Sequence, residues 1–462
     1  MDKNIDIATE KRTNWFERQF KIKASGSTIK TEIIAGITTF IAMSYILFVN
    51  PTILGDAGLD KEAVFVATAL TGVVGCLAMA FIANYPIAVA PGLGSNAFFA
   101  YSVVLGMGIP WQTALAGVFV ASLLFMLVTV LKVREVVINA IPANLKAAMA
   151  VGIGLFIAFT GLKQGGIVVG SAKSFVTITS WSDPHVWLTV FGLIVTIVLL
   201  ARKVPGALFI GLAATAIMGV VTGLIAMPHS IIASIPSLAP TFGVSIMNIH
   251  NVFNVQMAVV ILVFFFSVFF DTTGTVIGLA QQAGFIKDNK MPKEVGKALF
   301  ADSTSMIAGS VFGSTPTACY IESSTGIAAG GRTDFTAVVV AIMFVLSLFF
   351  SPLLVVVTSQ VTAPILIIVG SFMMKSIANI DWSEFEISFA AFMIILCVPL
   401  TYNISYDLAF GLITYTITMI AAGKGKKCIR LCMSLRSYSY YYSSQCTNYL
   451  LNKGDYSWIN QL

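Results

Sequence analysis

Long apolar segments separated by short polar loops run through most of the chain. Each approaches the roughly 20 residues that an α-helix needs to cross a bilayer. The first seven predicted spans are 31–53, 63–83, 87–104, 112–131, 147–162, 186–200 and 206–226. The second seven are 255–279, 296–312, 315–329, 335–357, 361–377, 387–402 and 408–422. The pattern predicts an all-α polytopic membrane protein with about 14 transmembrane spans.

The composition agrees with this class. The 462-residue chain is 57% hydrophobic and 10% charged, and its mean hydropathy is +0.89, as is typical of polytopic membrane proteins. We attribute the net charge of +6 to basic cytoplasmic loops rather than to a nucleic acid partner. Residues 1–30 are polar and basic and lack the apolar core of a signal peptide, so we expect a cytoplasmic N-terminal segment.

The lysines and arginines give a check on orientation. If the N-terminus is cytoplasmic, the even-numbered spans should end in basic loops. These ends carry Lys132, Arg134, Arg202, Lys203, Lys287, Lys290, Lys293, Arg332, Lys424, Lys426 and Lys427. The opposite loops, such as "GMGIP" and "MPHSIIASIPSLAP", are nearly free of Lys and Arg. We therefore expect both termini to lie in the cytoplasm.

The third span of each set is interrupted by proline and glycine. It reads "PIAVAPGLGSNAFFAYS" in the first set and "GSTPTACYIESSTGIAAGG" in the second, with Pro91 and Pro316 at matching places. An odd number of spans per set inverts the second copy, and paired interrupted helices point to the binding site of a transporter. We therefore predict two inverted repeats, 31–230 and 251–423, with spans 3 and 10 broken.

Two carboxylates lie inside apolar segments: Asp271 in "FFFSVFFDTTGTVIGLAQQAG" and Glu322 in the second broken span. An Asp at the centre of a membrane helix costs about 2.5–3.5 kcal/mol on insertion scales, so it normally faces protein or an aqueous cavity. We predict that both bind substrate and a coupled proton; a structural hydrogen bond or helix cap is the alternative. Uncharged candidates for substrate binding are Asn96, Thr272, Thr275 and Ser323, with Thr315, Thr317 and Ser324 as further polar groups.

Other polar residues receive structural interpretations. Asp302, in "LFADSTSM", is predicted to cap the start of the ninth span. His185, His229 and His250 fall in or beside the exterior loops, and we expect no role for them in proton transfer.

Enzyme chemistry is not indicated. The sequence has no phosphate-binding loop, HExxH motif or nucleophile elbow, and its six cysteines show no metal spacing or disulfide framework. We predict that the protein is not an enzyme and uses no metal or cofactor. Buried carboxylates can accept hydrogen bonds from N–H groups and can also carry a proton. This inventory suits a neutral, planar, N–H-bearing solute coupled to H⁺.

Several motifs in order resemble one family. They are "TEIIAGITTFIAMSYILFVNP", "APGLGSNAFFAY", "FDTTGT", "YIESSTGIAAGGRT" and "IDWSEFE", within about residues 31–426. Together they are similar to the AzgA-type adenine/guanine/hypoxanthine permeases of the nucleobase-cation symporter group. The resemblance implies a uracil-permease-like fold in which spans 1–4 and 8–11 form a core and spans 5–7 and 12–14 a gate.

The resemblance also implies a mechanism and a setting. The core would move against the gate like an elevator, importing hypoxanthine, guanine or adenine with H⁺ across the cytoplasmic (inner) membrane. A homodimer is implied as well. The alternatives are a uracil/xanthine or anion carrier of the same fold and a channel lined by the same acids.

Individual residues follow from the same resemblance. Asp271, before "TTG", and Glu322 match substrate-binding acids, and Asn96 matches a polar position of span 3. Two positions depart from the pattern. Val268 stands where many relatives carry a second acid, and Asp334 follows "GGRT" where they have glycine. The first departure bears on the proton route, and the second is expected to be peripheral.

The tail 424–462 breaks the apolar pattern. After Lys427 it reads "CIRLCMSLRSYSYYYSSQCTNYLLNKGDYSWINQL", where relatives continue with an apolar stretch beginning Pro-Leu-Met/Leu-Tyr. One permissible codon set for Lys427 to Leu435, read out of frame, encodes Met-Tyr-Pro-Leu-Met-Tyr-Val-Ile. We therefore interpret this atypical polar tail as a frameshift product; a genuine cytoplasmic tail is the alternative.

Overall fold

The computed structural model describes residues 15–131, 143–171, 175–179, 181–228, 230–283, 294–401 and 404–424. These residues are mostly helical, and among them eight helices are long and apolar enough to cross a membrane. Three shorter apolar helices accompany them, at Leu93–Gly106, Ala207–Val221 and Phe385–Thr401. The predicted helical class is confirmed, whereas the count of about 14 spans stays a prediction.

Some sequence-based predictions lie outside the described residues. They concern the orientation, one histidine and the tail. The residues are Lys132, Arg134, Lys287, Lys290, Lys293, Lys426, Lys427, His229 and the segment 425–462.

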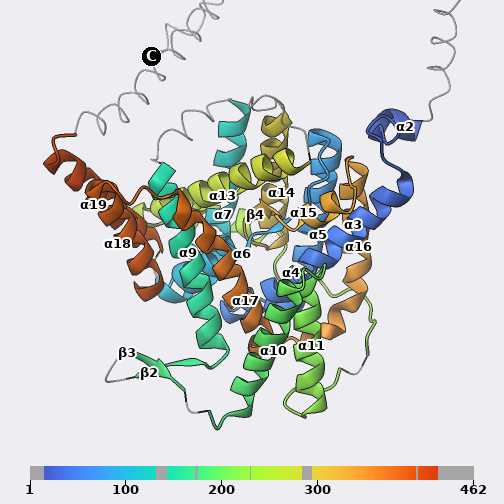
Figure 1. Cartoon of the computed structure of the whole chain (residues 1–462), viewed down its shortest axis with the longest axis horizontal. Helices are drawn as coiled ribbons and strands as arrows, with labels where there is room; N and C mark the ends of the chain where they lie inside the picture. Colours follow the sequence, from blue (N-terminus) through green and yellow to red (C-terminus); the bar gives the residue numbers. More distant parts are fainter. Residues whose placement is uncertain are drawn as a thin grey trace, which may run out of the picture.

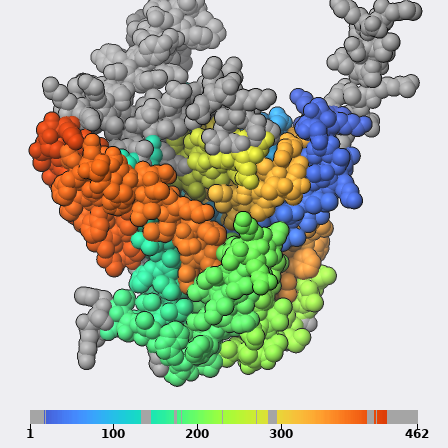
Figure 2. All heavy atoms as spheres, in the orientation of Figure 1, coloured from blue at the N-terminus to red at the C-terminus, as the bar shows by residue number. Residues whose placement is uncertain are grey.

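The helices divide into two groups by their contacts (Figure 1). The first helix group consists of α3 (Ile29–Met43), α4 (Ile46–Asp56), α5 (Lys61–Ala78), α7 (Trp111–Val130), α13 (Val255–Gln282), α14 (Glu294–Phe312), α15 (Ser323–Ala328) and α16 (Phe335–Ser347). The second helix group consists of α9 (Ala143–Gln164), α10 (Pro184–Ala201), α11 (Ala207–Val221), α17 (Ser359–Met373), α18 (Phe385–Thr401) and α19 (Ile404–Ala421). In Figure 2 the green residues of α10 and α11 form the lower face and the orange residues of the C-terminal helices lie on the left.

Short elements join these helices. The remaining helical pieces are α2 (Trp15–Phe20), α6 (Leu93–Ala97), α12 (Val244–Met247), the π-helical turns η1 (Met79–Ala83) and η2 (Phe98–Gly106), and the 3₁₀ turns η3 (Ile249–Val252), η4 (Leu348–Val356) and η5 (Met374–Asn379). Two antiparallel strand pairs are present in the described residues: β1 (Val89–Pro91) with β4 (Thr317–Cys319), and the hairpin of β2 (Val168–Ser171) and β3 (Phe175–Ile178). The sequence pattern predicts neither pair.

Side-chain caps fix where several helices begin. The Thr28 hydroxyl accepts a hydrogen bond from the Thr31 N–H (3.1 Å) ahead of α3, and Asp60 Oδ1 accepts from the Ala63 N–H (2.7 Å) ahead of α5. Such caps satisfy amides that have no partner within the helix. They stabilise the helix ends where the apolar segments give way to loops.

The predicted span 31–53 lies within one apolar helical stretch, Ile29–Asp56, in which a short turn separates α3 from α4. α3 ends at Met43, Ser44 and Tyr45 form a turn, and α4 begins at Ile46. Tyr45 is only 1% exposed, so the break places a buried phenol in the middle of an otherwise apolar segment. This side chain contributes to the site described below.

A polar cluster joins the two helix groups. Gln164, the last residue of α9, donates from Nε2 to Asp56 Oδ2 at the end of α4 (2.9 Å) and to the Tyr101 hydroxyl in η2. Tyr101 in turn donates to Asp56 Oδ2 (2.9 Å). Asp56 is exposed, so the joint lies where water can reach it.

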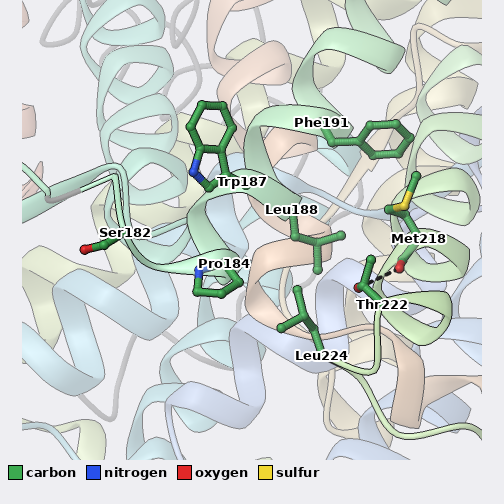
Figure 3. A pocket seen from close by; sticks show the side chains of 8 residues that line it. All are labelled: Ser182, Pro184, Trp187, Leu188, Phe191, Met218, Thr222 and Leu224. Carbon is green, nitrogen blue, oxygen red and sulfur yellow. Dashed lines mark hydrogen bonds between the residues drawn. The ribbon is translucent and has the colours of Figure 1, made fainter.

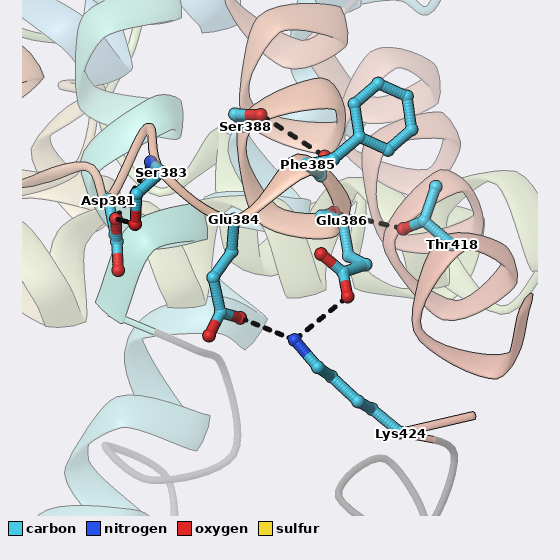
Figure 4. Close-up of polar contacts among 8 residues, drawn as sticks. All are labelled: Asp381, Ser383, Glu384, Phe385, Glu386, Ser388, Thr418 and Lys424. Atoms are coloured by element: carbon cyan, nitrogen blue, oxygen red, sulfur yellow. Dashed lines mark hydrogen bonds and ion pairs between the residues drawn. The ribbon is translucent and has the colours of Figure 1, made fainter. Parts of the chain in front are cut away.

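Ion pairs and a hydrogen bond join the C-terminal end of the described chain to the start of α18 (Figure 4). Lys424 Nζ donates to Glu386 Oε1 (2.9 Å) and Glu384 Oε2 (3.2 Å). The Thr418 hydroxyl of α19 donates to the Glu386 carbonyl (3.0 Å). Glu386 and Glu384 raise the pKa of the Lys424 ammonium, which therefore stays charged at neutral pH. These contacts hold α19 against the start of α18.

Asp334 occupies an unfavourable position before α16. The neighbouring Glu32 accepts hydrogen bonds from the Arg332 N–H (3.0 Å) and the Thr333 N–H (3.3 Å), so it satisfies the backbone of this loop. Asp334 is 4% exposed, and among the described residues its Oδ2 has no hydrogen-bond partner. Burial, together with repulsion from Glu32, raises the pKa of Asp334 to about 6.

We expect Asp334→Asn to stabilise the protein at pH 7.5, raising the melting temperature in detergent by about 2 °C. The folded-state pKa of Asp334 lies above the ordinary carboxyl value, so its ionised form destabilises the folded state above pH 6. Between pH 6 and 4 the folded protein binds a proton that the unfolded chain does not. The advantage of the Asn variant should therefore shrink as the pH falls through 6, and a pH-independent difference in melting temperature would contradict this account.

Candidate functional site

The two interrupted segments meet in the interior of the first helix group. β1 and β4 pair antiparallel, with Val89 opposite Cys319, Ala90 opposite Ala318 and Pro91 opposite Thr317. Beyond the strands, the Gly92 N–H donates to the Pro316 carbonyl (2.9 Å) and the Tyr320 N–H to the Ala88 carbonyl (2.9 Å). α6 and α15 each start within a few residues of the pair. The pairing brings polar groups from both halves of the chain to one place.

Neighbouring side chains complete the hydrogen bonding of this strand pair. The Ser323 hydroxyl accepts from the Ala88 N–H (3.0 Å), and Cys76 Sγ of α5 accepts from the Val89 N–H (3.4 Å). The Tyr320 hydroxyl donates to the Pro91 carbonyl (2.5 Å). Ser323, predicted as a substrate ligand, thus binds backbone of the other interrupted segment.

Glu322 lies between β4 and α15 and is half-buried. Its side chain does not cap α15. Instead, Glu322 Oε1 accepts a hydrogen bond from the Tyr45 hydroxyl at the break between α3 and α4 (2.7 Å). The carboxylate is therefore held by a hydrogen bond from outside its own segment.

Asp302 is fully buried and joins three elements. Its Oδ2 accepts from the Thr272 hydroxyl of α13 (2.6 Å), and its Oδ1 accepts from the Thr317 hydroxyl of β4 (2.7 Å). The prediction that Asp302 caps the start of a span is wrong, because α14 begins at Glu294 and Asp302 lies inside it. The predicted span 296–312 nearly matches α14, so the error lies in treating Asp302, which is inside that span, as a cap.

Asp271 lies on α13 beside this cluster. Its side chain is exposed, whereas its neighbour Thr272 is buried and Thr275 is half-buried. Asp271 is within electrostatic range of both Asp302 and Glu322. Three carboxylates from α13, α14 and the β4–α15 connection therefore gather in one region, and Asp271 and Glu322 are the two that are not fully enclosed.

Asn96 connects the two interrupted segments from the other side. The Thr315 hydroxyl donates to Asn96 Oδ1, and both side chains are fully buried. Within the described part of the chain, Asn96 Nδ2 has no hydrogen-bond partner. An unsatisfied buried amide is costly unless a ligand or water completes it. This arrangement makes Asn96 Nδ2 a donor available to a bound molecule.

The structure thus brings Asp271, Glu322, Asn96, Thr272 and Ser323 to the region of the strand pair. Their roles as ligands stay predictions. Sequence reasoning gave no functional weight to Tyr45 and took Asp302 for a cap. The signal for Asp302 was present, because a third acid within an apolar segment invites the same interpretation as Asp271. Tyr45 gave no such signal, since a tyrosine in an apolar segment is ordinary.

A cavity of ≈ 520 Å³ lies elsewhere, between α10 and α11 of the second helix group (Figure 3). Its lining is mostly apolar and consists of Ser182, Pro184, Trp187, Leu188, Phe191, Met218, Thr222 and Leu224. Its lining contains no titratable side chain, so it offers no group that could bind a proton. Its lining residues differ in chemistry from the carboxylate cluster.

The histidines remain outside the cluster. His185 Nδ1 lies 3.0 Å from Asp183 Oδ1 at the exposed start of α10, and His250 lies in η3. Hydrogen bonds from the His185 backbone N–H and side chain lower the pKa of Asp183, so this carboxylate stays ionised as a helix cap. The expectation that the histidines take no part in proton transfer stays a prediction.

Comparison with known proteins gives consistent matches. A family model described as "Permease family" matches residues 30–410. Guanine/hypoxanthine permease PbuG of Bacillus subtilis (strain 168) is 49% identical over 417 residues, covering 88% of this chain and 94% of the relative. Adenine permease AdeQ of Escherichia coli (strain K12) is 38% identical over 416 residues, covering 90% and 93%.

Solved structures agree in fold. The transmembrane domain of a cyanobacterium bicarbonate transporter, BicA, has a TM-score of 0.59 at 16% identity and covers 84% of this chain and 97% of its own. The overall structure of SLC26A9 has a TM-score of 0.58 at 11% identity, with 91% and 70% covered. At these identities the likeness shows the fold of a membrane transporter alone.

We expect Asp302→Asn to lower the melting temperature, because the neutral amide has one acceptor oxygen for the two threonine hydroxyls that now donate to two carboxylate oxygens. Charge-assisted hydrogen bonds contribute about 1.5–3 kcal/mol each, and disrupting buried ones leaves partners unsatisfied. Thermal unfolding in detergent measures the loss. Asp60→Asn is the matched control, since Asn caps a helix as well as Asp does; equal melting temperatures for the two variants would contradict a structural role for Asp302.

Proposed function

The chain belongs to the permease family, and on this premise we propose that it is a secondary active transporter that imports the purine nucleobases hypoxanthine, guanine and adenine. The observation that carries the proposal is the gathering of Asp271 and Glu322 beside the paired strands of the two interrupted segments. Relatives at 49% and 38% identity are named as guanine/hypoxanthine and adenine permeases. The protein is accordingly a multi-pass membrane protein, and we place it in the cytoplasmic membrane.

The polar groups suit a purine. A purine base is planar, carries ring and exocyclic N–H donors, and has ring nitrogens that accept hydrogen bonds. Glu322 and Asp271 supply acceptors, and the unsatisfied Asn96 Nδ2 supplies a donor. A site that binds polar groups in this way rejects analogues that lack them by roughly 10⁴-fold or more. Selectivity for purines would therefore come from a few side chains.

Transport also requires the site to open alternately to the two sides of the membrane. We assign the first helix group, together with β1, β4 and α6, which carry the rest of the site, as the core and the second helix group as the gate. This division supports an arrangement of about 14 spans in two inverted repeats, with the third span of each repeat built from a strand and a half-helix. The core would move past the gate like an elevator, with both termini cytoplasmic. A homodimer joined through membrane-buried surfaces belongs to the same proposal.

Proton coupling uses the carboxylates. An acid that faces a cavity inside the membrane can bind a proton from one side and release it to the other. Asp271 is exposed and Glu322 half-buried, so both can exchange protons when the site is open. No metal or cofactor is required.

The alternatives are weaker. The likeness to a bicarbonate transporter and SLC26A9 concerns fold alone, and three neighbouring carboxylates repel an anion. A channel needs a pore that conducts without saturation. A uracil or xanthine carrier of the same fold differs from the proposal only in substrate.

The first test measures uptake of radiolabelled hypoxanthine, guanine and adenine into cells that lack their own purine carriers. We expect saturable uptake that a protonophore abolishes, with excess uracil and sulfate competing poorly. Asp271→Asn and Glu322→Gln should each reduce uptake about 100-fold, since each removes a charged hydrogen-bond acceptor. Asp381→Asn, an exposed acid in the loop before α18, is the control and should transport normally at equal membrane abundance.

Two results would contradict the proposal. Undiminished uptake in both carboxylate variants would exclude them from the site. A wild-type protein that reaches the membrane and moves no purine, but conducts ions without saturation, would identify a channel.

The second test concerns movement of the core against the gate. In a background without the six native cysteines, cysteines at Asp56 and Gln164 should react with a short bifunctional thiol reagent, because these side chains are in contact. Crosslinking should stop purine uptake, and cleavage of the crosslink by a reducing agent should restore it. The single-cysteine variants treated in the same way are the controls. Full uptake by crosslinked protein would rule out movement at this joint.

A further inference from the structure

The Tyr45 hydroxyl binds a carboxylate of the candidate site, whereas the Tyr101 hydroxyl binds the carboxylate of Asp56 at the joint between the helix groups. A buried phenol needs a hydrogen-bond partner, and a backbone carbonyl is sufficient, as Tyr320 shows with Pro91. Tyr45 instead donates to the carboxylate of Glu322, 277 residues away in the chain (2.7 Å). The contact crosses from the break between α3 and α4 to the second interrupted segment.

The local structure makes this contact specific. The turn at Ser44 and Tyr45 lies at mid-span, where the backbone keeps right-handed helical angles, and Tyr45 is 1% exposed within the apolar core. A tyrosine side chain has only two flexible torsions, so packing on all sides fixes its hydroxyl closely. A glutamate has three flexible torsions and reaches many positions unless it is held. Glu322 makes no side-chain capping bond to α15, and the Tyr45 hydroxyl holds it from another segment.

We propose that Tyr45 is a positioning residue for substrate binding: its hydroxyl fixes Glu322 through Oε1 so that Oε2 faces the bound molecule. The ligand class is a planar heterocycle with an N–H donor, and this inference rests on the proposed purine transport. A phenol O–H donates to an ionised carboxylate, whereas a protonated carboxyl carries its own O–H and must rearrange. Tyr45 thereby also links the protonation of Glu322 to the break in the first span.

The test compares substrate affinity and turnover in purified protein reconstituted into liposomes. Tyr45→Phe keeps the ring and removes only the hydroxyl. We expect KM for hypoxanthine to rise about tenfold, as for the loss of a bond that orders a charged group, while the maximal rate per transporter changes less than twofold. Tyr85→Phe, at a buried tyrosine of the loop after η1, is the matched control and should leave KM unchanged.

A double-mutant cycle separates positioning from a purely structural role. Glu322→Asp shortens the side chain and withdraws the carboxylate from the Tyr45 hydroxyl. Adding Tyr45→Phe to Glu322→Asp should then change the dissociation constant for hypoxanthine less than twofold, although each single variant weakens binding. Additive losses of affinity in the double variant would overturn the inference. So would a Tyr45→Phe protein that binds at unchanged affinity but has fewer binding sites because its melting temperature has fallen.

Measurements on the wild type separate a failure of the proposed transport from a failure of the proposed role of Tyr45. If wild-type protein neither binds nor transports hypoxanthine, guanine or adenine, the proposed function fails. If the wild type transports and Tyr45→Phe matches it in KM, only the positioning role of Tyr45 fails.

Discussion

The backbone hydrogen bonds of the two interrupted segments are the constraint on which the rest of the site depends. Inside a membrane no water can satisfy an N–H or C=O group that leaves a helix. Pairing β1 with β4 supplies those partners, and Ser323 and Cys76 complete them at the edges. Segments as distant as Ala88 and Ser323, 235 residues apart, must therefore be neighbours. The meeting of the carboxylates follows from this need of the backbone.

The three acids then divide into two kinds by their partners. Asp302 is enclosed and bound by Thr272 and Thr317, so it stabilises the arrangement of α13, α14 and β4. Asp271 and Glu322 are accessible, and Glu322 has one oxygen fixed by Tyr45. An acid whose bonds are complete acts as part of the structure, whereas one with remaining acceptor capacity can bind a ligand or a proton.

The sequence predicts a good part of this. Periodicity and composition give the helical membrane class, and the rarity of charges in apolar segments singles out Asp271 and Glu322. The pattern of proline and glycine marks the two interrupted segments but says nothing of strands, because three-residue strands have no periodicity. Tyr45 escapes prediction for a different reason. Its importance lies in a partner 277 residues away, which no local pattern reveals. Asp302 is wrongly predicted to be a cap although it lies inside both the predicted span 296–312 and α14, because its hydrogen-bond partners Thr272 and Thr317 come from other elements.

The location of the weak contacts supports movement of the first helix group as a unit. Separating β1 from β4 would strip buried backbone groups of partners, at a cost that water cannot offset. The bonds from Gln164 to Asp56 and Tyr101 differ, because Asp56 is exposed and water can replace them. Since the strand pair and the carboxylates lie among helices of the first helix group, parting at this joint would leave the strand pair and its carboxylates together. A carrier that must keep its substrate bound while exposing it to the other side needs this combination of a rigid site and a replaceable joint.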